Sequence, residues 1–389
     1  AGGGGSGVVG GAVPGQPGVL LSMQRLDRIG PLSEMDGTVT AGAGTVGGEL
    51  ERWLRERGRT VGFLPRSLEL SSVGGWVATG ATGTASGRYG GIRERLVSLE
   101  VALTDGTLVT TPAMPRWGAG PDPRALFIGS EGTLGIVTEV TLAVPPVPEQ
   151  RLMRALWMPN LPSGLETLRE IAQAGIAPAT VCLFDAAETE RQKDLHGHDL
   201  PGCLLLLGCE GPAGLPLAQE HCLLAIAGRH GAADMARSVA ERWDASRQRR
   251  PDWFLALREP GVLADALDVQ APWSRLAGLH DALRQALAAE CDTVAMSFPE
   301  IHETGACCTV QFAIAAADDA EAVARYVRAW DAAMRTTLAN GGAIAHHQGI
   351  GIARAGWLAA QLGEAAEPLR RLKRAFDPAG LLNPGKLPG

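Results

Sequence analysis

The chain has 389 residues, and 35 lysines and arginines against 42 aspartates and glutamates leave a net charge of −7. This mild acidity argues against a nucleic-acid-binding protein and against a protein that docks on anionic lipid. Hydrophobic residues make up 46% of the chain and charged residues 20%, which is typical of a globular protein, and the length suggests two or three domains. Glycine is unusual: its 51 residues are about twice the common share, yet they form neither a Gly-X-Y repeat nor a Gly/Ser linker.

The apolar runs and the cysteines indicate the class of compartment. No apolar run approaches the roughly 18 residues of a transmembrane segment, and no secretory signal is visible. Seven cysteines without a CxxC pair favour free thiols in a reducing cytosol, with the adjacent Cys307 and Cys308 as packing residues. The chain opens on a glycine loop without Met, so we expect its natural start, and any targeting signal, to lie upstream. A cytoplasmic location is the expectation.

Residues 1–147 predict an α+β domain of short strands and glycine turns. Val46, Leu50, Trp53 and Leu54 share one helical face, and Gly58 is expected to cap that helix. The alternating pattern of 98–111, with Asp105-Gly106 at its centre, predicts a β-hairpin. Three prolines within 145–148 then break the pattern and mark the domain boundary.

Residues 148–389 predict a second domain in which strands and helices alternate in α/β style. The expected strands are 151–157, 203–207 and 308–314, and the expected helices are 165–174, 215–229, 275–289 and 318–339. The tail 369–389 predicts a basic amphipathic helix that Asp377-Pro378 ends, followed by a Gly/Asn/Pro turn.

Three glycine-rich clusters are the candidate binding elements. The first, 2–11, contains overlapping GxGxxG matches, but ValValGlyGlyAlaValPro at 8–14 follows the glycines of 2–7, and this sequence cannot open the helix that a dinucleotide fingerprint requires. Consecutive glycines still allow backbone N–H groups to converge on a pyrophosphate, although a plain surface turn explains this segment equally well. The second cluster, 65–91, has little hydrophobic periodicity, and the third, 128–139, is a tight turn that runs into a strand.

In this order and spacing, the three clusters resemble the flavin domain of FAD-linked enzymes of the vanillyl-alcohol oxidase type. Within that superfamily the chain is most similar to the alkyldihydroxyacetonephosphate synthase (alkylglycerone-phosphate synthase) family, through 67–77, AlaProTrp at 271–273, ThrGlyAla at 304–306 and 340–351. The resemblance spans essentially the whole chain. It implies a two-domain flavoprotein: an FAD-binding domain, 1–147, incomplete at its start, and a substrate domain, 148–389, with 369–389 returning to the cofactor cleft.

The resemblance implies FAD as the cofactor and assigns residues to it. The pyrophosphate is expected on the glycine loop, the ADP and flavin along the second cluster, and the adenine-ribose end near the third. The residues are Gly2, Gly3, Gly4, Gly5, Ser6 and Gly7, then Arg66, Ser67, Leu68, Glu69, Leu70, Ser71, Ser72, Thr79, Gly80, Ala81 and Thr82, then Glu131, Gly132, Thr133, Leu134, Gly135, Ile136 and Val137. Gly80 departs from the family, which has Arg there.

The substrate positions of the family transfer poorly. The family's catalytic Tyr is His302 here, its trio of histidines is reduced to His346 and His347 with Gln348 third, and a family His is Phe63. Two substrate arginines of the family fall on Cys182 and Phe254, neither of which can bind phosphate as Arg does. Arg249, Arg250 and Arg258 are candidates to replace them.

His302, His346 and His347 are the candidate catalytic residues. His302 suits a general base near neutral pH, against the alternative of a solvent-facing turn residue. The adjacent His346 and His347 are expected to point in opposite directions if their segment is extended. No metal-ligand spacing is visible, so no metal site is expected. Asn383 and Lys386 either reach the cofactor cleft or lie in a solvated turn.

These features favour an FAD-dependent oxidoreductase acting on a small hydroxy or keto substrate. The first alternative is an alkylglycerone-phosphate synthase, which exchanges acyl for alkyl on dihydroxyacetone phosphate in ether lipid biosynthesis without net redox change. The second is a flavin-binding remnant without turnover. The expected partner is a small-molecule substrate, and the sequence leaves open whether the chain forms a homodimer.

Overall fold

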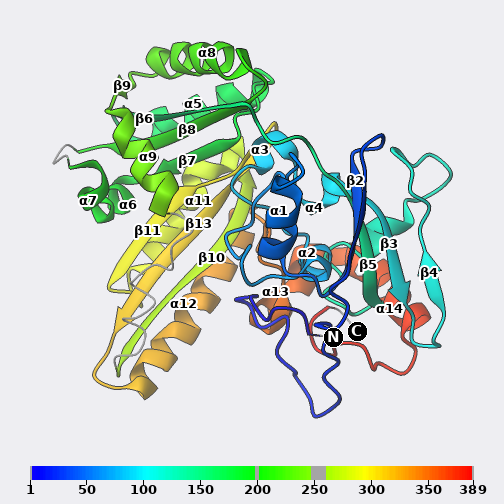
Figure 1. Cartoon of the computed structure of the whole chain (residues 1–389). Coiled ribbons are helices and arrows are strands. Elements are labelled where there is room, and N and C mark those ends of the chain that lie inside the picture. The colour runs from blue at the N-terminus through cyan, green and yellow to red at the C-terminus, as the bar shows by residue number, and fades with distance from the viewer. Residues whose placement is uncertain (1, 198–200, 247–259, 388–389) are drawn as a thin grey trace. The chain divides into compact units, whose positions relative to one another are not determined.

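The computed structural model describes residues 2–197, 201–246 and 260–387 (Figure 1). Contacts divide the chain into unit 1, Ala1–Val147 with His347–Gly389, and unit 2, Pro148–His346. The division after Val147 coincides with the expected boundary. The second domain was expected to run from 148 to 389, with 369–389 returning to the cofactor cleft. In this division unit 2 ends at His346, and the chain belongs to unit 1 from His347 onward.

Unit 1 is built on a five-stranded sheet in the order β1-β2-β5-β3-β4, whose pairs are all antiparallel. The strands are β1 Ile29–Ser33, β2 Thr38–Gly42, β3 Leu96–Ala102, β4 Leu108–Thr110 and β5 Ile136–Ala143. The helices are α1 Gly47–Arg55, α2 Val73–Thr79, α3 Ser86–Tyr89, α4 Ile92–Arg95, α13 Gly351–Leu362 and α14 Ala366–Phe376, with 3-10 turns at Pro123–Leu126 and Gly363–Ala365. The predicted hairpin is confirmed, since Val101 of β3 pairs with Val109 of β4.

Leu50 and Leu54 place α1 on the core, because residues four apart share a helical face and both side chains are fully buried. The expectation that Gly58 closes this helix is confirmed: the N–H of Gly58 donates to the carbonyl of Arg55 at 3.1 Å, and that of Arg59 donates to the carbonyl of Leu54 at 3.0 Å. Gly58 has the left-handed backbone that this kind of helix end requires, with φ +70°.

The second glycine-rich cluster contains a short helix where irregular chain was predicted. Ser72 caps α2 by accepting the N–H of Gly75 at 3.3 Å, and Gly80 ends it in the left-handed conformation with φ +68°. Trp76 of this helix is buried in the core of unit 1. The prediction missed α2 because capping and one buried tryptophan, instead of hydrophobic periodicity, define so short a helix.

Unit 2 is built on an eight-stranded sheet in the order β10-β13-β11-β7-β8-β6-β9, with β12 paired to β13 (Figure 1). The strands are β6 Gln150–Met158, β7 Thr180–Phe184, β8 Cys203–Gly211, β9 Ala233–Asp234, β10 Val262–Pro272, β11 Thr293–Phe298, β12 Ile301–His302 and β13 Gly305–Ala315. The helices are α5 Leu161–Gln173, α6 Ala186–Arg191, α7 Lys193–His196, α8 Leu215–Arg229, α9 Arg237–Ser246, α11 Trp273–Leu287 and α12 Asp319–Ala339. Every predicted strand and helix of this region lies within one of these elements or overlaps it closely.

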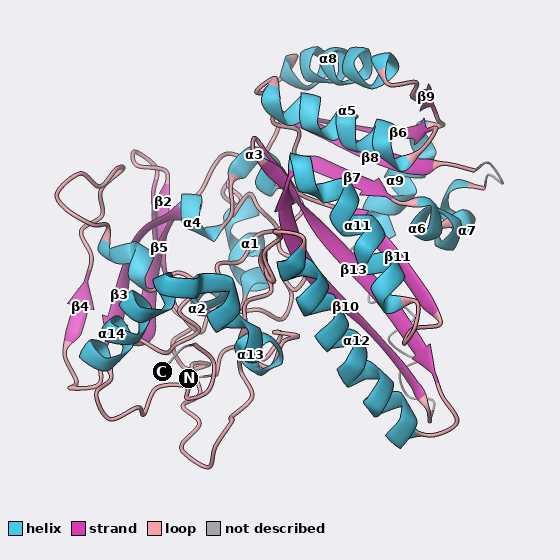
Figure 2. Cartoon of the chain, turned by 180° about the vertical axis from the view of Figure 1, so that it is seen from behind, coloured by secondary structure: helices cyan, strands magenta, loops and turns pink. Residues whose placement is uncertain are grey.

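Helices cover the sheet of unit 2 on both faces. Leu204 and Leu206 of β8 share a buried cluster with Val239 and Ala240 of α9, and the alternate side chains of β8 face the side that α5 and α8 cover. Further along the sheet, α11 and α12 run beside β10 and β13 (Figure 2). Every strand pair in the sheet is antiparallel. Alternating helices and strands often accompany a parallel sheet, but in this unit they do not.

The cysteines are free thiols, and six of the seven are buried, as their interpretation as packing residues predicts. Burial raises the pKa of Cys203 and of Cys291 to about 12, so these thiols are unreactive at neutral pH. Among the residues that the structure describes, no helix has the length and hydrophobicity that crossing a membrane requires.

We expect only Cys222, which is exposed on α8, to react with a thiol reagent in the native protein. A titration with a chromogenic disulfide at pH 8 should release one equivalent rapidly and the remainder only after denaturation. The Cys222→Ser variant should lose the rapid phase and keep the slow one. Rapid reaction of two or more thiols would contradict the burial of the others.

Candidate functional site

The glycine loop of unit 1 packs tightly against the second glycine-rich cluster. Gly2 anchors the loop, since its N–H donates to the carbonyl of Leu21 at 2.8 Å. A Cβ added to Gly3 would lie 2.2 Å from Ser72 Oγ, and one added to Gly4 would lie 1.7 Å from the carbonyl oxygen of Leu70. Only glycine allows this approach, so the sequence of the loop is dictated by its neighbour.

The other side of the glycine loop offers hydrogen-bond donors. A Cβ on Gly5 or Gly7 would meet nothing within 4 Å. Within the described part of the chain, the backbone N–H groups from Gly3 to Gly7 make no hydrogen bond to the protein. Successive N–H groups of this kind form an anion-binding nest, which fits the pyrophosphate of a dinucleotide. The loop therefore suits the FAD that the resemblance implies.

Residues 66–72 serve the packing of unit 1 as well as the glycine loop. The carbonyls of Leu68 and Ser71 accept the N–H groups of Gly48 and Gly47 at the start of α1. Leu68 is buried in the core, and Glu69 forms an exposed ion pair with Arg52 at 2.9 Å. These side chains are committed to the protein itself, whereas Leu70 is half-exposed and Arg66 is exposed.

Residues 79–82 form the end of α2 and the turn after it. Thr79 Oγ1 donates to the carbonyl of Gly75 at 3.0 Å, and the N–H of Ala81 donates to that of Trp76. Gly80 is at the left-handed position, where the arginine of the related family would be strained. The glycine is therefore explained by the backbone at this position.

The third cluster places Glu131 at the centre of unit 1. Glu131 is buried and has φ +51°, and its carboxylate accepts the N–H of Ile350 at 2.5 Å and that of Gly351 at 2.9 Å. Burial raises the pKa of this carboxyl, while the two N–H groups and the charges of Lys386 and Arg354 oppose the shift. The remaining predicted residues of the cluster, Gly132, Thr133, Leu134, Gly135, Ile136 and Val137, continue through a turn into β5.

The tail returns to the glycine-rich start of the chain. Asn383 Nδ2 donates to the carbonyls of Gly11 at 3.1 Å and Glu131 at 2.7 Å. Lys386 is fully buried, and its Nζ donates to the carbonyl of Val13 at 2.7 Å. Both residues therefore contact the segment that follows the glycine loop and do not lie in a solvated turn.

Arg354 is a buried residue of this region that the sequence analysis missed. Its guanidinium donates to the carbonyl of Gly349 at 2.8 Å and to Gln348 Oε1 at 2.9 Å. Gln348, at a histidine position of the related family, thus orients an arginine. Its position as the one charged residue of α13 was the available signal.

Two histidines meet in unit 2. His302 lies exposed on β12, and its Nε2 is 2.8 Å from Nε2 of His346, with the ring centroids 5.1 Å apart. At this distance the two nitrogens form a hydrogen bond, in which one nitrogen donates its N–H and the other accepts it. The contact could not be predicted, because 44 residues separate the two histidines along the chain.

Acidic groups hold this histidine pair in place. Asp268, fully buried on β10, accepts the backbone N–H of His346 at 2.8 Å, and Gln270 Nε2 donates to the carbonyl of Ala345 at 2.8 Å. The carboxylate of Glu300 lies 3.8 Å from His346 Nε2. The sequence analysis singled out neither acid.

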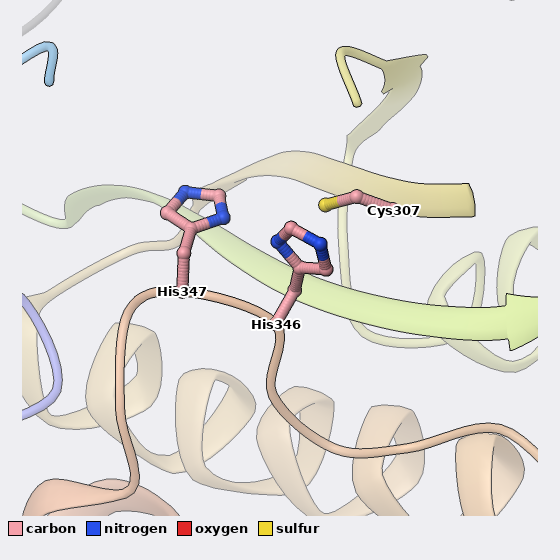
Figure 3. A group of neighbouring side chains, drawn as sticks. All are labelled: Cys307, His346 and His347. Atoms are coloured by element: carbon pink, nitrogen blue, oxygen red, sulfur yellow. The ribbon is translucent and has the colours of Figure 1, made fainter. Parts of the chain in front are cut away.

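Histidines 346 and 347 extend to the same side of their segment, with His346 beside Cys307 (Figure 3). The expectation that they point in opposite directions is therefore wrong, because the chain turns at this point and is not extended. One ligand atom each of Glu300, His302 and His346 lie within 4.8 Å of one another. The sequence spacing did not reveal this group, and the absence of a metal site stays a prediction.

The remaining family substrate positions are buried within one of the two units or lie outside the described residues. Phe63 is fully buried in the core of unit 1, edge-on to Trp76. Cys182 is buried in β7 of unit 2. Phe254, Arg249, Arg250 and Arg258 lie outside the residues that the structure describes.

A pocket of about 530 Å³ adjoins the hairpin that carries His302. Gln173, Pro272, Trp273, Ser274, Glu303 and Thr304 line it. The indole N–H of Trp273 donates to the carbonyls of His302 and Glu303, both at 3.1 Å, and so fixes the ring in the wall. The volume falls within the range of small-molecule sites, roughly 300–1,000 Å³.

The fold and the family matches define an FAD-linked oxidase. Residues 147–387 match the family "FAD linked oxidases, C-terminal domain", and residues 1–112 match "FAD binding domain". The chain belongs to the FAD-linked oxidase family, and FAD is its cofactor. The two-unit fold is that of vanillyl-alcohol-oxidase-type enzymes.

The chain is similar to two kinds of enzyme within this family. It is 28% identical to the alkyldihydroxyacetonephosphate synthase of Caenorhabditis elegans, over 93% of this chain and 66% of the synthase. It is 30% identical to a probable mitochondrial D-lactate dehydrogenase of Danio rerio, over 98% of this chain and 78% of that protein. A solved structure of an alkyldihydroxyacetonephosphate synthase shares the fold, with a TM-score of 0.78 at 23% identity over 98% of this chain and 70% of that one.

Because the added Cβ would overlap the carbonyl oxygen of Leu70, Gly4→Ala should move the glycine loop and weaken FAD binding at least about tenfold, or about 1.4 kcal/mol. Titration of the apoprotein with FAD, followed by fluorescence quenching, measures the affinity. Gly18→Ala is the control, since its Cβ would meet nothing within 4 Å. Unchanged affinity in Gly4→Ala would show that the loop does not hold the cofactor.

Asp377 provides a pH-dependent test of the tail. Burial alone would raise its pKa, but Lys373 and the N–H groups of Leu382 and Leu381 more than offset burial and hold the pKa below its usual range. The contribution of Asp377 to the free energy of unfolding is therefore present above the pKa that its carboxyl has in the unfolded chain, about 3.9. This contribution is lost as the pH falls through the lower pKa of the folded state. We expect Asp377→Asn to destabilise the protein by about 1–3 kcal/mol at pH 7.

Urea unfolding at several pH values between 7 and 3 measures this effect, and the difference between Asp377→Asn and the wild type should shrink at the acidic end. Glu364→Gln, which removes an exposed carboxylate from the neighbouring 3-10 turn, is the control. A difference that stays constant with pH would contradict the ion pair.

Proposed function

We propose that the protein oxidises a hydroxyl group of a small molecule with FAD, and that the His302–His346 pair accepts the hydroxyl proton. The observation that carries this proposal is the 2.8 Å distance between the two Nε2 atoms. Imidazole is the side chain best suited to take a proton near neutral pH. His347, the next residue in the chain, is kept as a second candidate base.

The chemistry needs two acceptors. An alcohol that becomes a carbonyl loses a hydride from carbon and a proton from oxygen, and bound FAD supplies the hydride acceptor. A histidine pair that takes the proton gains one positive charge. The carboxylate of Glu300, 3.8 Å from His346 Nε2, stabilises that charge.

Residues of unit 1 would hold the cofactor. The N–H groups from Gly3 to Gly7 suit the pyrophosphate, and the close packing of Gly3 and Gly4 keeps the loop in shape. The predicted assignments along 66–72, 79–82 and 131–137 are proposed as the walls of this site, with backbone groups making most of the contacts.

The non-redox synthase reaction is the second candidate, and the similarity to the Caenorhabditis elegans synthase favours it. Its substrate carries a phosphate, for which an arginine is the usual partner. Cys182, at one of the two arginine positions of that family, is buried in β7 and offers no charge. We therefore rank the oxidation first.

A cytoplasmic location is part of the proposal, supported by the free cysteines, which suit a reducing compartment. A homodimer is a further hypothesis that size-exclusion chromatography with light scattering tests.

We expect His302→Phe and His346→Phe to slow anaerobic FAD reduction by a substrate at least about 100-fold while FAD stays bound. Stopped-flow absorbance of the flavin, after mixing with a panel of alcohols and hydroxy acids, measures the rate. His221→Phe is the matched control, because His221 is exposed on α8.

Full rates in both Phe variants would overturn the role of the pair. Ether-linked product from a fatty alcohol and acyl-dihydroxyacetone phosphate, without flavin reduction, would favour the synthase. Bound FAD with neither activity would favour the inactive remnant.

A further inference from the structure

We infer that residues 381–387 control how tightly unit 1 binds FAD, because they hold the segment that continues from the glycine loop. We call residues 381–387 the tail strap. The inference rests on the proposed position of the FAD pyrophosphate on the glycine loop. It adds two positioning residues, Asn383 and Lys386, which act on the cofactor through the backbone of that segment.

The tail strap binds two alternate carbonyls of the segment after the glycine loop. Asn383 Nδ2 donates to the carbonyl of Gly11 at 3.1 Å, and Lys386 Nζ donates to that of Val13 at 2.7 Å. Lys386 is fully buried, and a buried polar group that loses its partner costs free energy. These two bonds therefore hold the segment against the strap.

Helix α13 holds the start of the same segment. The carbonyl of Val9 accepts the N–H of Ala353 at 3.1 Å, and a Cβ added to Gly351 would lie 2.0 Å from that carbonyl oxygen. Glu131 joins the two supports, because its carboxylate accepts the N–H of Gly351 at 2.9 Å and its backbone carbonyl accepts Asn383 Nδ2 at 2.7 Å. The strap and α13 thus support residues 9–13 together.

The glycine loop runs directly into this supported segment. Its start is fixed by the bond from the N–H of Gly2 to the carbonyl of Leu21 at 2.8 Å. Its other end leads to Gly11, which lies four residues beyond Gly7 and at most about 14 Å away along an extended chain. Because an anion nest requires its N–H groups to converge, a shift of the segment at Gly11 weakens the nest.

The two strap residues differ in charge. Burial lowers the pKa of Lys386, and the carboxylate of Glu131 opposes this shift. Lys386→Met therefore removes both a hydrogen bond and the charge that faces Glu131. Asn383→Gly removes only hydrogen bonds, since glycine tolerates the left-handed backbone at this position, with φ +39°. We expect the lysine variant to bind FAD more weakly than the glycine variant.

Thermodynamic linkage provides a test on the unaltered chain. If the strap strengthens FAD binding, bound FAD must hold the strap in place by the same factor. Lysine occurs only at Lys193, Lys373 and Lys386, so acylation with an N-hydroxysuccinimide ester, followed by peptide mass spectrometry, reports on each position. Because Lys386 is already fully buried, FAD slows its acylation only by making local opening rarer.

We expect saturating FAD to slow the acylation of Lys386 at least about tenfold relative to the apoprotein. Lys193, on α7 of unit 2, should change less than about twofold. Lys373 on α14 distinguishes a local effect from a general stabilisation of unit 1. It should slow less than about threefold, because Thr133 and Asp377 bind its ammonium as well as the strap does.

Fluorescence titration of the apoprotein with FAD tests the same coupling from the other side. The affinity should fall at least about tenfold in Lys386→Met and at least about threefold in Asn383→Gly. Lys193→Met is the matched control, because it removes a lysine from unit 2, and it should bind FAD within about twofold of the wild type.

Equal slowing of Lys373 and Lys386, no slowing of Lys386, or wild-type affinity in both strap variants would overturn the inference. The acylation result does not depend on the folding of any variant. If Gly4→Ala weakens FAD binding while both strap variants bind normally, the loop site stands and the strap alone fails. If Gly4→Ala also binds FAD normally, the proposed cofactor site fails together with the strap.

Discussion

The buried carboxylate of Glu131 organises unit 1. It accepts the N–H groups of Ile350 and Gly351, while the backbone carbonyl of the same residue accepts Asn383. Three segments far apart in the sequence thus meet at one residue with a left-handed backbone. A buried charge is costly unless hydrogen bonds satisfy it, so this carboxylate constrains its partners closely. The residues that join unit 1 after His346 do so partly through these bonds and partly through others, such as that of Lys386 to Val13.

Close backbone packing is the second constraint, and it explains where the glycine excess lies. Gly351 approaches Val9 so closely that a Cβ would lie 2.0 Å from its carbonyl oxygen, much as Gly4 approaches Leu70. In the glycine loop, one side packs closely against its neighbours. The backbone N–H groups on the other side stay open, where a pyrophosphate would bind. Part of the glycine content serves the packing of the protein and only part serves the ligand, although both uses occur in one loop.

Unit 2 contributes chemistry of a different kind. Its antiparallel sheet places Asp268 on β10 and His302 on the short β12, the two strands that pair with β13, and His346 contacts both residues. The carboxylate of Glu300, 3.8 Å from His346 Nε2, suits a proton acceptor at this pair.

The sequence alone determined the long, regular elements and the family. The helix at Leu215–Arg229 was predicted with its observed limits, and the hairpin around Asp105-Gly106 was predicted by its turn, because periodicity and turn residues act locally. The resemblance that the glycine clusters carry implied FAD, and the family match bears this out. The short helix Val73–Thr79 was missed, because its capping residues and one buried tryptophan replace periodicity.

Only the tertiary structure decided which polar residues act together. Glu131 with Gly351, His302 with His346, and Lys386 with Val13 are contacts between segments that are distant in the chain, and no spacing in the sequence encodes them. The same holds for the acidic surroundings of the histidine pair, since Asp268 and Glu300 lie in unremarkable strand and loop sequence. A pattern reports the neighbours of a residue along the chain, whereas charge and hydrogen bonding depend on its neighbours in space.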